Sequence, residues 1–282
     1  MSELIYGAYG GGWDENPLNL VDRVKHLGFD MIEIGVGDDP TLDLKKVRAK
    51  AEEAGLKIIT CTGCPRDKDP IDEEERIRKR GIVYLKQCVE AAAALGADCL
   101  AGLTYSSVGR RLGSRPMEQY WEWGSTALKQ VARHAQKFGI TVAFETVNRY
   151  ETILNNTVDQ ALRFREMVGE PNFMIHLDTF HLNMEEESLY QATKKALPYT
   201  CHYHFAEGNR GRIGKGSVDW EGVYRALSEG RYHGTVTLEA FVNMNPEIAA
   251  KLSMWRKIGE STDRNLQEGL KYLKGLEAKY YG

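Results

Sequence analysis

The chain has 282 residues, of which 42% are hydrophobic, and 37 basic and 40 acidic residues give it a formal net charge of −3. This balance provides no basic surface for nucleic acid. No run of 18 apolar residues indicates a membrane span, and the amino end has no basic and apolar leader. We therefore expect a cytoplasmic protein whose partner is a small molecule, with no nucleic acid and no membrane.

Short runs typical of β-strands alternate with longer amphipathic stretches, which is the pattern of repeated strand and helix units. The predicted strands are Leu4–Tyr9, Met31–Gly35, Lys57–Cys61, Cys99–Leu103, Thr141–Thr146, Phe173–Asp178, Cys201–Phe205 and Thr235–Ala240. The predicted helices lie near Asn19–His26, Asp43–Ala54, Asp72–Leu95, Met117–Phe138, Thr157–Val168, Glu187–Ala196 and Trp220–Glu229, with a helical tail over about 246–282. Eight such units predict an α/β fold, a (β/α)8 TIM barrel that forms a single domain over residues 1–282.

Two further stretches carry weaker signals. The segment Tyr105–Ser114 is expected to be a long loop over the mouth of the barrel. Cys61 and Cys64 have the spacing of a zinc-binding pair, but no second pair accompanies them. Because the five cysteines are scattered among apolar segments, we expect reduced thiols rather than disulfides.

Four predicted strands in the second half each end with a side chain that can bind a metal ion. These residues are Glu145, Asp178, His204 and Glu239. The carboxyl ends of the strands meet at one mouth in a parallel barrel, so the sequence predicts a metal site there. Three carboxylates and one imidazole favour Mn²⁺, Co²⁺ or Mg²⁺ over structural zinc. Any one carboxylate could instead cap the next helix, but four consecutive strand ends favour a metal site.

The surrounding motifs resemble those of the ketose 3-epimerases. They are ETVNRYE over 145–151, HLDTFHLN over 176–183, HYHFAEGNRG over 202–211, GKG over 214–216 with the Asp-Trp pair at 219–220, and LEAF over 238–241. This family includes D-tagatose 3-epimerase and D-allulose (D-psicose) 3-epimerase, within the sugar isomerase/epimerase TIM-barrel superfamily. The resemblance covers nearly the whole chain, and the motifs match in order and spacing.

The resemblance implies roles for individual residues. The implied metal ligands are Glu145, Asp178, His204 and Glu239, with Mn²⁺ as the expected ion and Co²⁺ or Mg²⁺ as alternatives. Glu145 and Glu239 are also the implied acid and base. The implied substrate-binding residues are Glu151, His181 and Arg210, with Tyr6 and Phe241 as aromatic residues of the pocket. A homodimer or homotetramer is implied as well.

The expected reaction interconverts C3 epimers of free ketoses, such as D-fructose and D-allulose, D-tagatose and D-sorbose, or pentuloses. A carboxylate takes the C3 proton, a cation stabilises the cis-enediolate, and a carboxylic acid on the opposite face returns a proton. Because both glutamates also contact the cation, their proton affinities are coupled.

Several alternatives stay open at this point. The same metal barrel would suit an aldose–ketose or hydroxypyruvate isomerase, or a polyol dehydratase, and a sugar-binding barrel without chemistry is a further hypothesis. In the glycine-rich stretch GNRGRIGKG over 208–216, Arg212 and Lys215 could bind a phosphorylated substrate together with the glycine amides. His176 and His202 share strand parity with ligands, and we interpret them as hydrogen-bonded residues behind the site rather than as ligands.

Overall fold

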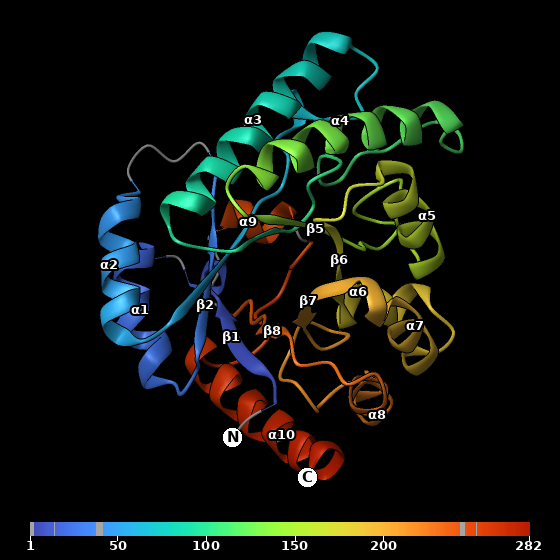
Figure 1. Ribbon diagram of the computed structural model, residues 1–282. Helices are drawn as coiled ribbons and strands as arrows, with labels where there is room; N and C mark the ends of the chain where they lie inside the picture. Colours follow the sequence, from blue (N-terminus) through green and yellow to red (C-terminus); the bar gives the residue numbers. More distant parts are fainter. Residues whose placement is uncertain (1–2, 14, 38–41, 243–245, 252) are drawn as a thin grey trace.

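The computed structural model describes residues 3–13, 15–37, 42–242, 246–251 and 253–282. Eight parallel strands pair in chain order, and the last pairs with the first, so the sheet closes into a barrel (Figure 1). The strands are β1 (Ile5–Tyr9), β2 (Met31–Gly35), β3 (Lys57–Cys61), β4 (Cys99–Ala101), β5 (Thr141–Glu145), β6 (Phe173–Asp178), β7 (Thr200–Phe205) and β8 (Thr235–Leu238). The predicted TIM barrel is confirmed.

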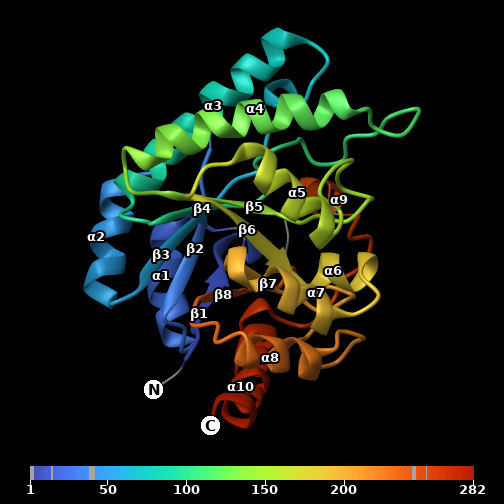
Figure 2. The same cartoon turned by 45° about the vertical axis from the view of Figure 1, so that its right-hand side comes forward.

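Helices form the outer layer around the barrel, and α3 and α4 lie side by side in both views (Figures 1 and 2). The α-helices are α1 (Pro17–His26), α2 (Leu44–Ala54), α3 (Glu75–Ala94), α4 (Glu118–Gln136), α5 (Val158–Val168), α6 (Thr179–Glu185), α7 (Leu189–Ala196), α8 (Trp220–Glu229), α9 (Pro246–Lys251) and α10 (Thr262–Tyr281). Short 3-10 turns span η1 (Gly10–Gly12), η2 (Arg66–Lys68) and η3 (Leu197–Tyr199). Within the described ranges, no helix is both long enough and apolar enough to cross a bilayer.

The two faces of each strand pack against different layers. Outward side chains such as Phe144 join the large apolar cluster between strands and helices, whereas Met31 and Ala143 belong to a small cluster inside the barrel. Side chains in a strand alternate between faces, so the residues two positions further along share the inner face. Those residues are Glu33 and Glu145. The same alternation that fills the barrel with apolar side chains therefore places carboxylates near its carboxyl end.

The structure differs from the predicted elements after β6 and at the ends of β4 and β8, which stop two residues earlier than predicted. It also differs in the predicted helical tail, where the non-helical residues 253–261 precede α10. The short helix α6 was not predicted because it begins directly after β6, with no loop between them. Asp178 ends the strand and caps the helix, since its Oδ1 accepts a hydrogen bond of 2.7 Å from the Phe180 N–H. This helix carries His181 one turn after Asp178. Strand β8 ends at Leu238 rather than Ala240, so Glu239 lies just beyond it.

The predicted loop over the mouth is anchored by a buried arginine. Arg110 is 1% exposed, and its guanidinium donates to Asp69 at 3.0 Å, to Asp72 at 3.2 Å and to Glu73 at 2.6 Å. These acidic residues lie between β3 and α3, so the ion pairs join two loops of the barrel. These ion pairs therefore hold the loop over 105–114 against the loop between β3 and α3 at the mouth of the barrel.

Replacing Arg110 by alanine should destabilise the fold strongly, because Asp69 is fully buried and would lose its cation. Removing one partner of a buried ion pair costs about 3–5 kcal/mol. Unfolding followed by circular dichroism measures the change. The matched control is Arg76→Ala, which removes an exposed pair with Glu74 and should change stability little. Equal losses in the two variants would contradict this role of Arg110.

Candidate active site

A cavity of about 410 Å³ opens at the carboxyl ends of the strands. Its volume lies in the range of small-molecule sites. Seven of the residues predicted for the site line it, and these are Glu145, Glu151, His181, His204, Arg210, Glu239 and Phe241. Side chains that are far apart in the sequence thus converge on one chamber.

The four predicted metal ligands lie close together; Glu145, His204 and Glu239 line the cavity, whereas Asp178 is fully buried and is not among its lining residues. Glu145, Asp178 and His204 each offer a ligand atom, and these atoms lie within 4.8 Å of one another. Glu239 adjoins the group, since its Oε1 lies 3.2 Å from His204 Nδ1, and Glu145 Oε1 lies 3.8 Å from the same nitrogen. Glu239 also forms an ion pair with Arg210. The side chains can therefore surround one point.

The electrostatics of this group fit a cation. Among the described residues, neither Asp178 Oδ2 nor His204 Nδ1 has a hydrogen-bond partner, although both atoms are buried. Buried polar atoms without partners are rare and costly. Burial, with the Asp178 carboxylate as a further cause, raises the pKa of Glu145 to about 8. Burial also raises the pKa of Asp178. A divalent cation would provide the missing partner and offset the crowded negative charge.

Behind the ligands lies Glu33, which the sequence analysis missed. This side chain on β2 is fully buried, and it accepts hydrogen bonds of 2.9 Å from His202 Nε2 and from His204 Nε2. Burial alone would raise the pKa of Glu33, but the two histidines hold it well below its usual range. A charged residue in the middle of the apolar strand MIEIG was the signal that could have revealed it.

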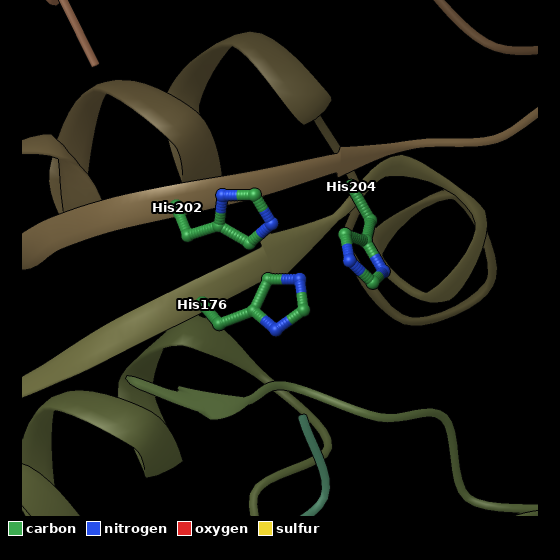
Figure 3. A group of neighbouring side chains, drawn as sticks. All are labelled: His176, His202 and His204. Carbon is green, nitrogen blue, oxygen red and sulfur yellow. The ribbon is translucent and has the colours of Figure 1, made fainter. Parts of the chain in front are cut away.

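The two histidines that we interpreted as lying behind the site make hydrogen bonds there. His202 Nδ1 lies 2.7 Å from Thr235 Oγ1, and His176 Nδ1 accepts from the Gly102 N–H at 3.3 Å. The ring of His176 packs edge-on against that of His204, with 4.0 Å between centroids. Figure 3 shows the three imidazoles beside one another on β6 and β7.

His181 is a neutral hydrogen-bond donor that lies beside two of the predicted metal ligands, Glu145 and Asp178. Its Nδ1 accepts from the backbone N–H of Asn148 at 3.3 Å, so the ring proton lies on Nε2. Nε2 lies 3.6 Å from Glu145 Oε1 and 3.5 Å from Asp178 Oδ2. Burial keeps the pKa of His181 well below its usual value, so the ring is neutral. Its N–H can therefore polarise a carbonyl oxygen placed in the cavity.

Asn148 connects two of the predicted substrate-binding residues, and the sequence analysis missed it although it lies in the ETVNRYE motif. Its side-chain Nδ2 lies 2.7 Å from His181 Nδ1 and donates to Glu151 Oε1 at 3.1 Å. Glu151 is thereby fixed beside His181 on the wall of the cavity.

Arg210 is held between aromatic rings and carboxylates. Its guanidinium carbon lies 3.9 Å from the ring centroid of Phe180 and 4.9 Å from that of Phe241. A nitrogen of the same group lies 3.6 Å from Asp178 Oδ2. The backbone of Arg210 has a φ of 57°, a left-handed conformation that costs a residue with a side chain about 1 kcal/mol. Such a backbone at a polar cavity is typical of functional positions.

The glycine-rich loop is organised by the buried carboxylate of Glu207, which the sequence analysis also missed. Glu207 accepts hydrogen bonds from the Gly214 N–H at 2.9 Å, the Val218 N–H at 3.0 Å and Trp220 Nε1 at 3.0 Å. These donors therefore already bind an anion, the carboxylate of Glu207. This arrangement argues against a phosphate site on the same amides.

The prediction that Tyr6 is an aromatic residue of the pocket is wrong, because the structure does not bring this side chain to the cavity. It is fully buried, and its hydroxyl lies 2.9 Å from that of Tyr224 on α8, between the strands and the outer helices. Residues of β1 alternate between faces, and Tyr6 occupies the outer one. Tyr9 lies at the mouth instead, where it lines the cavity and packs edge-on against Phe241 at 5.9 Å between centroids.

The cysteines agree with the expectation of reduced thiols. All five are free, and Cys64 Sγ lies 3.4 Å from the Thr104 carbonyl oxygen as a hydrogen-bond donor. Neither of the candidate metal groups found among the described residues contains a cysteine.

Comparisons with known proteins agree with this geometry. The model of the xylose isomerase-like TIM barrel family matches residues 21–274. A ketose 3-epimerase from Arthrobacter globiformis is 33% identical over 251 residues, which cover 84% of this chain and 83% of that protein. An L-ribulose 3-epimerase from Mesorhizobium japonicum is 30% identical over 238 residues, covering 84% and 80% respectively.

A solved structure extends the similarity to the whole barrel. The D-allulose 3-epimerase from Methylomonas sp. superposes with a TM-score of 0.92 at 26% identity, covering 98% of this chain and 99% of that one. The family match spans most of the chain, and the relatives are similar over more than two thirds of their own lengths. The chain therefore belongs to the xylose isomerase-like TIM barrel family and, within it, to the ketose 3-epimerases, which makes it a carbohydrate epimerase.

Proposed function

We propose that this protein inverts C3 of free ketoses in a metal-dependent reaction, with Glu145 and Glu239 as its two proton-transferring groups. The observation that carries the proposal is the approach of both carboxylates to one nitrogen, His204 Nδ1, at 3.8 Å and 3.2 Å. They come from β5 and from the end of β8, so they can approach a bound sugar from different sides. Inversion needs one group to take a proton and another to return one.

The proposed ligands of the divalent cation are Glu145, Asp178, His204 and Glu239. The unpartnered Asp178 Oδ2 and His204 Nδ1 support this set. An oxygen-rich donor set favours Mn²⁺, with Co²⁺ or Mg²⁺ as alternatives. When bound, the cation supplies positive charge against the negative charge that develops on the sugar oxygens next to C3.

The side chains around the ligands have complementary tasks in this proposal. Loss of the C3 proton places negative charge on the ketone oxygen and gives an enediolate. His181, neutral and protonated on Nε2, donates a hydrogen bond to that oxygen. Arg210 donates to hydroxyl oxygens, and Glu151 accepts from a hydroxyl. A proton returned to the opposite face of C3 completes the inversion.

The proposed substrates are ketoses without phosphate, of five or six carbons. The loop amides that would suit a phosphate already bind Glu207. The relatives are named for L-ribulose, a pentulose, and for D-allulose, a hexulose. The pairs D-fructose and D-allulose, or D-tagatose and D-sorbose, are the hexuloses that we propose. The homodimer or homotetramer that the resemblance implies stays a prediction.

A panel of free and phosphorylated ketoses, incubated with Mn²⁺ and followed by NMR, tests this function. We expect C3 epimers of free ketoses as the products. Aldoses as the main products would support the isomerase alternative instead. A strong preference for phosphorylated ketoses would contradict the proposed substrate class.

Replacing Glu145 or Glu239 by glutamine should each lower kcat by about 10²–10⁴-fold, because a glutamine cannot exchange a proton with C3. Bound Mn²⁺ should be quantified in each variant so that loss of metal is separated from loss of proton transfer. Glu53→Gln, on the exposed face of α2, is the matched control and should keep full activity. Substantial turnover in both site variants would refute the assignment of two proton-transferring glutamates.

Metal binding should strengthen as pH rises toward about 8, because the cation must displace the proton of Glu145. A carboxyl whose pKa rises on folding favours the folded state at low pH, and this contribution is lost as pH rises from about 4.5 to about 8. Mn²⁺ should therefore raise the Tm of the protein more near pH 8 than near pH 4.5. For one displaced proton, affinity falls about tenfold per pH unit below this pKa. Thermal shift and calorimetric titrations check this, and a pH-independent shift would contradict it.

Tyr6→Phe and Tyr9→Leu should separate stability from substrate binding. The first change removes the Tyr6 hydroxyl with its hydrogen bond to Tyr224, so it should cost about 1 kcal/mol of stability and leave KM unchanged. The second removes a wall of the cavity and should raise KM several-fold. Steady-state kinetics and thermal unfolding of both variants give the comparison. A higher KM in the Tyr6 variant would speak against its position in the outer layer.

A further inference from the structure

Three residues around the proposed ligand His204, namely His176, His202 and Glu33, have no role in the proposed reaction as described so far. One ring nitrogen of each histidine lies within 4.8 Å of those of the other two, as in a metal site (Figure 3). All four residues are at most 3% exposed. A buried group of this kind needs a physical explanation.

The hydrogen bonds argue against a second metal ion in this cluster. A metal needs a nitrogen lone pair from each imidazole. His176 Nδ1 accepts from the Gly102 N–H, so its other nitrogen carries the proton. His202 Nε2 must donate to Glu33, because a carboxylate only accepts, which leaves Nδ1 as the acceptor facing Thr235 Oγ1 at 2.7 Å. In these tautomers, neither His176 nor His202 has a nitrogen lone pair that is free to bind a metal.

The same reasoning fixes the orientation of His204. Its Nε2 lies 2.9 Å from both oxygens of Glu33 and must therefore carry a proton. In the neutral ring, the lone pair then lies on Nδ1. That nitrogen has no hydrogen-bond partner and faces Glu145 and Glu239. Of the six nitrogens in the three rings, Nδ1 of His204 alone is a free acceptor.

We propose that Glu33 is a positioning residue, which holds the proton of His204 on Nε2 and so directs the Nδ1 lone pair at the bound metal. This inference rests on the metal site of the proposed function. Hydrogen bonds to the distal nitrogen of a ligating histidine fix its tautomer and ring orientation and increase its basicity. The buried negative charge of Glu33 also adds to the attraction for a cation.

The geometry makes the carboxylate hard to replace at this position. Glu33 serves two donors at once, His202 Nε2 and His204 Nε2. A glutamine offers only one acceptor oxygen, and its amide would place a donor against the second ring. In either orientation that amide would face His204 Nε2, which lies 2.9 Å from both carboxylate oxygens, and it would oppose the proton on this nitrogen. An aspartate keeps two acceptor oxygens but reaches less far into the barrel.

The first test uses the unaltered protein with Mg²⁺, which is diamagnetic and suits NMR. The 15N chemical shifts of the histidines report which ring nitrogen carries the proton, and His204→Asn assigns the signals by their loss. We expect Mg²⁺ to change the Nδ1 signal of His204, while Nε2 keeps its proton. A proton on Nδ1 of His204 with the metal bound, or no response of this ring to the metal, would overturn the proposal.

The second test measures Mn²⁺ affinity by competition with a chelator, without any sugar. Glu33→Gln should weaken binding by about 10–100-fold, and Glu33→Asp should weaken it less. The matched control is Glu277→Gln, which changes a buried carboxylate that accepts from the N–H groups of Glu3 and Leu4 at the start of β1. This control should keep the wild-type affinity.

The outcomes separate this proposal from the proposed reaction. If the protein fails to epimerise ketoses but Glu33→Gln still weakens Mn²⁺ binding, the reaction is wrong and the role of Glu33 stands. Wild-type affinity in Glu33→Gln, weaker binding by Glu33→Asp than by Glu33→Gln, or no Mn²⁺ binding by the unaltered protein would overturn the role. Should Glu33→Gln fail to fold, the NMR measurement on the unaltered protein still decides.

Discussion

The crowding of three carboxylates inside the mouth of the barrel is the constraint on which the rest of the site depends. Glu145, Asp178 and Glu239 gather beside His204, and burial there opposes negative charge. Arg210 offsets part of this charge through its contacts with Asp178 and Glu239. Burial, with the Asp178 carboxylate as a further cause, raises the pKa of Glu145, and the proposed cation would favour the ionised form of this group.

Much of the barrel and the strand-end residues could be predicted because both follow from local patterns. Strand alternation and repeated units give the fold, and parallel strands bring their carboxyl ends together. Glu33 could not be found in this way, since its partners lie 169 and 171 residues away in the sequence. Tyr6 was placed wrongly because the resemblance gave a residue type, whereas the register of β1 decides which face it occupies. The roles of the ligands and bases stay predictions.

Buried polar side chains that do not touch the cavity centre hold those that do. Glu207 organises the loop that carries Arg210, Asn148 connects His181 with Glu151, and Glu33 contacts His204. Buried hydrogen-bond networks are favourable only when their members find partners. Asp178 Oδ2 and His204 Nδ1 are among the buried atoms of the described residues that lack hydrogen-bond partners, and both belong to the proposed ligand set, where a cation would complete the site.

The central proposal is that one glutamate removes the C3 proton and the other returns a proton to the opposite face. Incubation of a free ketose with the protein and Mn²⁺ in heavy water, followed by NMR, tests it most directly. We expect solvent deuterium at C3 of the epimeric product and at no other carbon, because the proton is removed from one face and a solvent-derived one is returned to the other. Deuterium at C1 or C4 with none at C3, or a C3 epimer that contains no deuterium in any solvent mixture, would contradict it.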